Sequence, residues 1–201
     1  MRILVLLAVL LCASCGQASD YLPQDGDLIF HTSRSAQSQA IQRATHSRYS
    51  HMGMVLHREG KAFVLEAGKT VQWTPLAQWI ARGDEGHYVV KRLRAADALL
   101  TAQVRQKLRS EALRLQGRRY DAAFGWSDER IYCSELVWKA YQRALGLRIG
   151  ELQKLKDFDL SDAAVQAKLK ERYGDQIPME EDVISPAAMF ASPLLIEVER
   201  N

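Results

Sequence analysis

A cysteine at the start of an amphipathic helix is the feature of this sequence that most limits how the chain can fold. Apolar residues follow Cys133 at spacings of four, three and four, at Val137, Ala140 and Ala144. These spacings place Cys133 on the stripe of the helix that faces the core. The first turn of a helix carries unpaired N–H groups and the positive end of the helix dipole, which lower the pKa of a thiol and can hold an oxyanion. Cys133 is therefore either a nucleophile or, as most free cysteines are, a small buried hydrophobic residue.

The first 18 residues are typical of an export signal. An apolar run over residues 3–13 is too short to span a bilayer and follows a basic N-terminus. Gly16 and Ala18 supply small residues at the third and first positions before a cut after Ala18. We expect an exported protein, located in the periplasm or anchored to an envelope membrane. Residues 19–201 are expected to form a single domain, because no repeat or low-complexity linker divides them.

A second processing route is lipid attachment at Cys15. Residues 13–15 resemble the end of a bacterial lipobox, although Cys12 stands where such boxes usually carry Leu. Such an anchor is the one contact with a membrane that we expect. By either route Cys133 would be a lone free thiol in an oxidising compartment, where cysteines normally pair. A lone thiol of this kind favours the interpretation of Cys133 as a nucleophile.

Composition excludes several classes of function. The net charge of +3 comes from basic residues scattered among acidic ones, so nucleic acid is not an expected partner. Apart from Cys12 and Cys15 there is no paired-cysteine spacing, and no His-Glu-x-x-His motif occurs, so no metal site is predicted. Glycine patterns that bind phosphates or dinucleotides are absent, and no cofactor is expected.

A β-hairpin is predicted to place two polar side chains together. Residues 50–56 and 62–67 have the composition of strands, and Gly60 lies in the turn between them. If Glu59 and Gly60 form a two-residue turn, Glu66 lies diagonally across from His51 on the same face. A shift of one residue in register would move Glu66 to the opposite face, so the prediction depends on that turn.

The remaining elements alternate short strands with helices. Short apolar runs predict strands at residues 28–30, 71–73, 88–93 and 194–198. Helical spacing predicts helices over residues 97–116, from Cys133 to Gly146, in the charged tail 151–174 and from Ser185-Pro186 onward. The order predicts an α+β fold, with an antiparallel sheet packed against helices.

Two further segments have local signals. Thr74 followed by Pro75 predicts a helix start, with Thr74 as the N-cap and a helix that runs to about Ile80. Residues 33–46 are rich in Ser and Gln with apolar residues at helical spacing. This pattern favours a solvated surface helix over a polar helix that lines a cleft.

A thiolate nucleophile needs a base and a group that orients the base. His51 is the best base among the five histidines, because its strand can bring it beside a core-facing cysteine. Glu66 could accept a hydrogen bond from the far ring nitrogen of His51. Tyr120, Tyr132 and Ser134 are candidates for contacts with substrate or with an oxyanion. The alternative for His51 is a purely structural role, and the alternative for Glu66 is a salt bridge at the surface. The three remaining candidates could instead only pack or cap.

The order of the motifs is similar to that of a known family. Several stretches resemble, in this order, the exported YiiX-type permuted papain-like amidases, relatives of the NlpC-type cell-wall peptidases: residues 26–30, 49–55, 66–67, 120–121 and 132–137. The resemblance extends through residues 126–128, 153–156 and 158–160. It implies a circularly permuted papain-like fold, in which the histidine strand precedes the cysteine helix. It also implies Cys133 as nucleophile, His51 as base, Glu66 as the third polar member and Tyr120 as a tyrosine that lines the site.

Together these features predict an exported cysteine amide hydrolase that works through an acyl-enzyme. Location and kinship favour peptide substrates from peptidoglycan. One alternative is a hydrolase or acyltransferase that acts on a lipid or lipoprotein with the same site. Another is a catalytically silent module that binds an envelope component.

Overall fold

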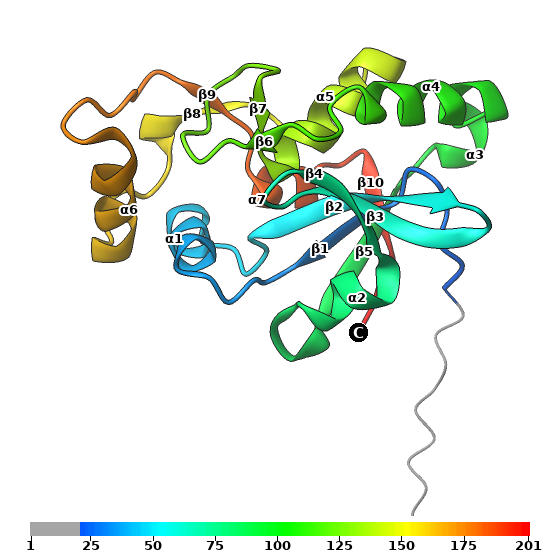
Figure 1. The fold of residues 1–201 in the computed structure, drawn as a ribbon, viewed down its shortest axis with the longest axis horizontal. Coiled ribbons are helices and arrows are strands. Elements are labelled where there is room, and N and C mark those ends of the chain that lie inside the picture. Colours follow the sequence, from blue (N-terminus) through cyan, green and yellow to red (C-terminus); the bar gives the residue numbers. More distant parts are fainter. Residues whose placement is uncertain (1–20) are drawn as a thin grey trace, which may run out of the picture.

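The core of the protein is a six-stranded antiparallel sheet, seen in a computed structural model that describes residues 21–201 (Figure 1). The strand order is β10-β5-β1-β2-β3-β4. The strands are β1 (Leu28–His31), β2 (His51–Arg58), β3 (Lys61–Ala67), β4 (Val71–Pro75), β5 (Tyr88–Leu93) and β10 (Leu195–Arg200). The predicted signal over residues 1–18 and the predicted lipid site at Cys15 lie outside the described residues.

Helices cover both faces of the sheet. The α-helices are α1 (Ala36–Thr45), α2 (Leu76–Ala81), α3 (Ala96–Leu99), α4 (Ala102–Leu113), α5 (Cys133–Leu145), α6 (Ala163–Tyr173) and α7 (Pro186–Phe190). In Figure 1, α4 and α5 lie above the sheet and α2 lies below it. None of the helices within residues 21–201 has both the length and the apolar character needed to cross a membrane.

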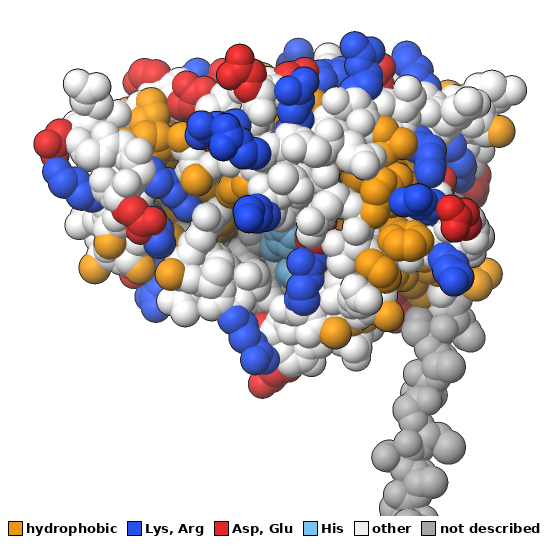
Figure 2. Space-filling view, in the orientation of Figure 1, with side chains coloured by type: hydrophobic (Ala, Val, Ile, Leu, Met, Phe, Trp, Pro, Cys, Tyr) orange, Lys and Arg blue, Asp and Glu red, His pale blue; other side chains and the backbone are white. Residues whose placement is uncertain are grey.

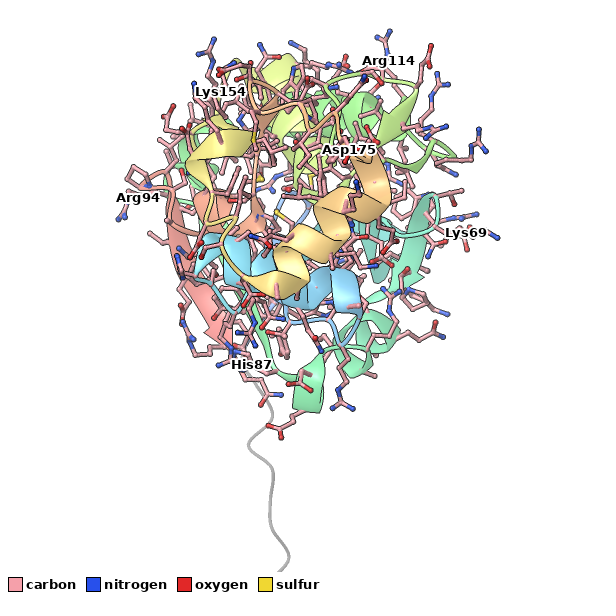
Figure 3. The ribbon with its side chains drawn as sticks, turned by 90° about the vertical axis from the view of Figure 1, so that its left-hand side faces the viewer. Lys69, His87, Arg94, Arg114, Lys154 and Asp175 are labelled. Atoms are coloured by element: carbon pink, nitrogen blue, oxygen red, sulfur yellow. The ribbon has the colours of Figure 1, made fainter. Side chains whose placement is uncertain are left out.

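Short elements connect these helices. They are the 3-10 helices η1 (Asp84–Gly86) and η2 (Leu155–Asp157) and the two-residue strands β6 (Arg119–Tyr120), β7 (Arg130–Ile131), β8 (Gln153–Lys154) and β9 (Asp182–Val183). At one end of the molecule α1 and α6 pack against each other. Figure 3 shows α6 crossing in front of α1, with Asp175 just beyond the C-terminal end of α6.

The alternation of side chains along β1 explains the two layers of core. Phe30 belongs to the larger core, which also contains Leu136 and Val137 of α5. Ile29 points the other way and packs with Trp79 of α2. Successive residues of a strand point to opposite faces of the sheet, so Ile29 and Phe30 lie in different cores. All five of these residues are fully buried. The sheet is therefore apolar on both faces and needs a helix on each.

The hairpin of β2 and β3 has the predicted register. Met54 lies opposite Leu65, and the pairing runs to the two-residue turn of Glu59 and Gly60. Both turn residues have positive φ, of 52° and 73°, which is the geometry that favours a tight hairpin. His51 and Glu66 consequently project from the same face of the sheet, as predicted.

Several predicted elements are confirmed, and the predicted bounds of two helical segments differ from those in the structure. The strands, the helix that begins at Cys133 and the Ser185-capped helix are present. The helix predicted over residues 97–116 is divided, because Thr101 caps a new helix by accepting a hydrogen bond from the Val104 N–H. The charged tail 151–174 is helical only over η2 and α6.

The prediction that Thr74 caps a helix is wrong. Strand β4 continues through Pro75, and α2 begins at Leu76 without a side-chain cap. The hydroxyl of Thr74 is instead directed to Glu66, where it takes part in the site described next.

Candidate active site

His51 and Glu66 form the first contact of the candidate site. His51 opens β2 and Glu66 is the second-last residue of β3. The Nε2 atom of His51 lies 2.7 Å from Oε2 of Glu66. The Glu66 side chain is completely buried, and a buried carboxylate needs partners for both oxygens. The predicted pair is therefore present, and its carboxylate is held inside the protein.

Three more donors surround the Glu66 carboxylate. Oε1 accepts from the Thr74 hydroxyl at 2.6 Å and from Nη2 of Arg82. Oε2 accepts from Nε1 of Trp79 at 2.9 Å, in addition to His51. Burial alone would raise the pKa of Glu66, but the bonds to His51 and Thr74 and the charges of His51 and Arg82 outweigh it and lower the pKa to about 2. Glu66 is thus an ionised acceptor at any physiological pH.

Cys133 lies close enough to His51 for the two side chains to interact. Its side chain is 2% exposed and lies in the first turn of α5, which packs against β2 and β3. Burial raises the pKa of the thiol, but the hydrogen bond and charge of His51 and the backbone N–H groups of Met52 and Ser134 lower it below the ordinary value. For His51, burial lowers the pKa, but the contacts with Cys133 and Glu66 raise it to about 9. These opposite pKa shifts favour a thiolate beside an imidazolium.

An aromatic wall fixes the ring of His51. The rings of His51 and Trp79 stack with centroids 5.9 Å apart and an angle of 24°. His31 stacks on Trp79 at 3.9 Å and is 2% exposed. Burial, followed by the charges of His51 and Arg82, lowers the pKa of His31 to about 3, so this ring is neutral. His31 therefore supports the wall without adding a second positive charge beside His51.

The site opens into two cavities on either side of Tyr120. The polar cleft contains His51 and Glu66 in its wall together with polar residues of α1 and of the loop before it: Ser33, Ser35, Gln37 and Ser38. The apolar cavity contains Cys133 in its wall and lies between α1, α6 and the start of α5. Figure 2 shows histidine side chains inside a hollow near the middle of the face that it presents. The prediction that residues 33–46 form only a solvated surface helix is wrong, since α1 lines both cavities.

Tyr120 stands at the boundary between these cavities, as predicted for a residue that lines the site. Its hydroxyl oxygen accepts a hydrogen bond from Nε2 of Gln37 at 2.7 Å. Burial and the negative charge of Cys133 raise the pKa of Tyr120 well above its ordinary value, so the hydroxyl keeps its proton. Among residues 21–201 no acceptor takes that proton, and it is available to a ligand.

The hydroxyl groups of Tyr132 and Ser134 have internal partners. The Tyr132 hydroxyl accepts from the N–H of Ile184 at 3.1 Å, and the Ser134 hydroxyl donates to the carbonyl of Ile184 at 2.7 Å. Both residues border the apolar cavity with their remaining atoms. Their hydroxyl groups fix the segment around Ile184 against the first turn of α5, and the contact with substrate or an oxyanion stays a prediction.

Sequence patterns did not indicate three residues of the site. Thr74, Trp79 and Arg82 all donate to Glu66, and they come from β4, α2 and the residue after α2. No short motif joins them to Glu66, and Thr74 gave a signal for a helix cap that tertiary structure overrides. Gln37 was also missed, because its polar neighbours resemble those of a solvated helix.

Comparisons with known proteins agree with this arrangement. Residues 22–199 match a family described as permuted papain-like amidase enzyme, YaeF/YiiX. The chain is 56% identical over 179 residues to "Uncharacterized protein YiiX" of Escherichia coli, which covers 89% of this chain and 87% of that protein. It also matches the crystal structure of "metalloprotein yiiX" of Escherichia coli, with 56% identity and a TM-score of 0.86 over 90% of this chain and 99% of that chain.

That protein is called a metalloprotein, so the donor atoms of this chain bear on whether it could hold a metal. Within residues 21–201 no group of three or more His, Cys, Asp or Glu side chains is arranged to hold a metal ion. Glu66 is already surrounded by four donors, one of which is His51. The side chains of residues 21–201 therefore do not fit a resident metal.

Proposed function

Since this chain belongs to the family of permuted papain-like amidases, we propose that it hydrolyses amide bonds with Cys133 as nucleophile, His51 as acid and base, and Glu66 as the group that orients His51. The observation that carries the proposal is the 2.7 Å contact of His51 with a fully buried Glu66, together with the interaction of His51 with Cys133, which raises the pKa of His51. A carboxylate in this place fixes the ring and stabilises the imidazolium. The thiolate is thereby formed before substrate binds.

The reaction follows from these positions. Sγ of Cys133 attacks the amide carbonyl carbon, and the oxyanion is stabilised by N–H groups of the first turn of α5 and by the Tyr120 hydroxyl. The carbon–nitrogen bond breaks as His51 gives its proton to the leaving nitrogen. A water molecule then gives a proton to His51 and attacks the thioester carbonyl. The carbon–sulfur bond breaks, and the acid and the thiolate are released.

The proposed location is the periplasm or an envelope membrane, reached through the export signal of residues 1–18, with Cys15 as the lipid site if an anchor is added. Location and family favour peptides from peptidoglycan as substrates. A lipid or lipoprotein acyl group is the second candidate, and the apolar cavity beside Cys133 favours it. The preformed pair of Cys133 and His51 argues against a catalytically silent binding module.

The test is hydrolysis of amides by the purified full-length protein, followed by mass spectrometry. Muropeptides and N-acyl amides are the two substrate panels, and Cys133→Ala is the inactive control. We expect cleavage by the parent, no cleavage by Cys133→Ala, and an acyl group on Cys133 when the reaction is stopped early. Binding of muropeptides without cleavage, by the parent and Cys133→Ala alike, would refute the hydrolase and support the binding module.

A further inference from the structure

Gln37 links α1 to the tyrosine that stands between the two cavities. It lies in the first turn of α1, half-buried in the wall of the polar cleft. Its Nε2 atom donates a hydrogen bond of 2.7 Å to the hydroxyl oxygen of Tyr120. The two residues are 83 positions apart in the chain, so this contact depends on the packing of α1 and not on local sequence. The proposed reaction gives Gln37 no part.

Serine hydroxyls fix the start of α1 and, with it, the position of Gln37. Ser35 caps the helix by accepting a hydrogen bond from the N–H of Ser38. The hydroxyl of Ser38 is hydrogen-bonded to that of Ser50, which directly precedes His51. Ser38 and Ser50 are only 2% and 3% exposed, so this bond is shielded from water. The first turn of α1 is therefore tied to the strand that carries His51.

The hydroxyl group of Tyr120 has one proton to donate and an oxygen that can accept. Gln37 donates to the oxygen, and none of the residues 21–201 accepts the proton. Tyr120 borders both the cavity that contains Cys133 and the cleft that contains His51. Because Gln37 occupies the accepting side of the hydroxyl, the O–H is left to point at a group bound between these two residues.

The bond from Gln37 also makes the Tyr120 hydroxyl a stronger donor. Burial is the largest cause of the raised pKa of Tyr120, whereas the charge of Arg172 and the hydrogen bond from Gln37 lower it. Hydrogen bonds in a chain polarise one another, so a phenol that accepts one bond donates the next more strongly. The gain is largest when the acceptor is negative, as an oxyanion is. It is therefore larger in the transition state than in the free enzyme.

We propose that Gln37 is a positioning residue of the reaction, whose amide directs the Tyr120 hydroxyl at the oxyanion and strengthens it as a donor. The inference rests on the proposed function, in which that hydroxyl stabilises the oxyanion. When Sγ of Cys133 bonds to the carbonyl carbon, an electron pair of the C=O bond moves to the oxygen. Tyr120 donates a hydrogen bond to this oxygen and keeps its proton. Gln37 acts through Tyr120 and takes no part in making or breaking bonds.

Two reagents that modify Cys133 differ in whether an oxyanion forms. With p-nitrophenyl acetate, sulfur bonds to the carbonyl carbon, an oxyanion forms, and the carbon–oxygen bond breaks to release p-nitrophenolate. Iodoacetamide loses iodide from a tetrahedral carbon, and no oxyanion forms. The full-length protein with Cys12 and Cys15 changed to Ser leaves Cys133 as its one thiol, and Cys133→Ala gives the background rate. Dividing the acetylation rate constant by the alkylation rate constant separates the oxyanion donors from the reactivity of the thiolate.

Gln37→Leu removes the hydrogen bond to Tyr120. It should lower the acetylation rate constant by roughly threefold to tenfold, as expected for one hydrogen bond, and leave alkylation unchanged. Gln37→Glu keeps the size of the side chain, but its carboxylate accepts the Tyr120 proton and withdraws it from the oxyanion. The loss should then approach the value of about 100-fold expected for Tyr120→Phe. This variant also serves if Gln37→Leu does not fold, since Glu and Gln have similar helix propensities.

The matched control is Gln39→Leu, at an exposed position of the same helix, which should change neither rate constant. A double-mutant cycle then tests whether Gln37 acts through Tyr120. Gln37→Leu should cause no further loss of acetylation once Tyr120→Phe is present. The same loss in both backgrounds would overturn the inference. An equal fall in alkylation would overturn it too, because the change would then disturb the pair of Cys133 and His51.

The remaining outcomes separate this inference from the proposed function. Slow acetylation of Tyr120→Phe with an unchanged or faster rate in Gln37→Leu would overturn the role of Gln37 and leave the proposed function intact. Acetylation of Tyr120→Phe at the parental rate would refute the oxyanion role of Tyr120, and this inference would fail with it. If no amide is cleaved but the acetylation rates follow the expected pattern, the amidase function fails and the role of Gln37 is supported.

Discussion

Replacing Glu66 with Gln would remove the charge of the site and preserve the size of the side chain. Four donors point at the two carboxylate oxygens, from His51, Thr74, Trp79 and Arg82. An amide has one acceptor oxygen, so its NH2 group would face two donors. Glu66→Gln therefore removes an ionic acceptor and introduces a direct conflict between donors.

The expected loss of stability follows from the pKa of Glu66. The pKa falls from 4.5 to about 2 in the folded protein. At about 1.36 kcal/mol for each pKa unit, the ionised carboxylate stabilises the fold by roughly 3 kcal/mol at neutral pH. Because the folded pKa is the lower one, this contribution is complete above about pH 4.5 and is lost as the pH falls toward 2. The difference between parent and Glu66→Gln should narrow over the same range.

Urea unfolding of both proteins at pH 7 and at pH 3.5 is the assay. The matched control is Glu180→Gln, since Glu180 is exposed and paired with Lys156 at the surface. This control should lose less than about 1 kcal/mol. A loss below about 1 kcal/mol for Glu66→Gln at pH 7 would show that the ionised carboxylate does not stabilise the fold. A difference in stability between parent and variant that is the same at both pH values would show this too.

Two further predictions concern single hydroxyl groups. Thr74→Val removes one donor to the Glu66 carboxylate. The free energy of unfolding in urea at pH 7 should fall by about 1.5–3 kcal/mol, as expected for the loss of a hydrogen bond to a charged group. An unchanged free energy of unfolding would mean that the bond is not formed. Tyr120→Phe should lower kcat by about 100-fold if its hydroxyl stabilises the oxyanion. The pH dependence of Cys133 alkylation in Tyr120→Phe should stay close to that in the parent. An unchanged kcat would exclude a role of the Tyr120 hydroxyl in stabilising the oxyanion.

Local patterns predicted the parts of the site that depend on neighbouring residues. The turn of Glu59 and Gly60 fixes the register of β2 and β3, so the placement of Glu66 near His51 followed from the sequence. The amphipathic spacing after Cys133 likewise predicted α5 and its buried first turn. In both cases a short stretch of chain carries the information.

The remaining parts depend on contacts between distant elements. Trp79 and Arg82 reach Glu66 because α2 packs under the sheet, and nothing in their own sequence neighbourhood indicates a carboxylate. Thr74 and Pro75 form a local signal for a helix start, but strand pairing extends β4 through Pro75. The polar side chains of α1 resemble those of a surface helix, and only its packing against α6 shows that it lines the cavities.

If Cys133 and His51 form a reactive ion pair, Cys133 loses its proton at a lower pH than a free cysteine does, and the rate of its alkylation by iodoacetamide against pH measures this. The full-length protein with Cys12 and Cys15 changed to Ser isolates the signal of Cys133. We expect a midpoint well below the free-thiol pKa of about 8.5, and an upward shift of that midpoint in His51→Ala. A midpoint at or above about 8.5 in the parent, or the same midpoint in both proteins, would contradict the ion pair.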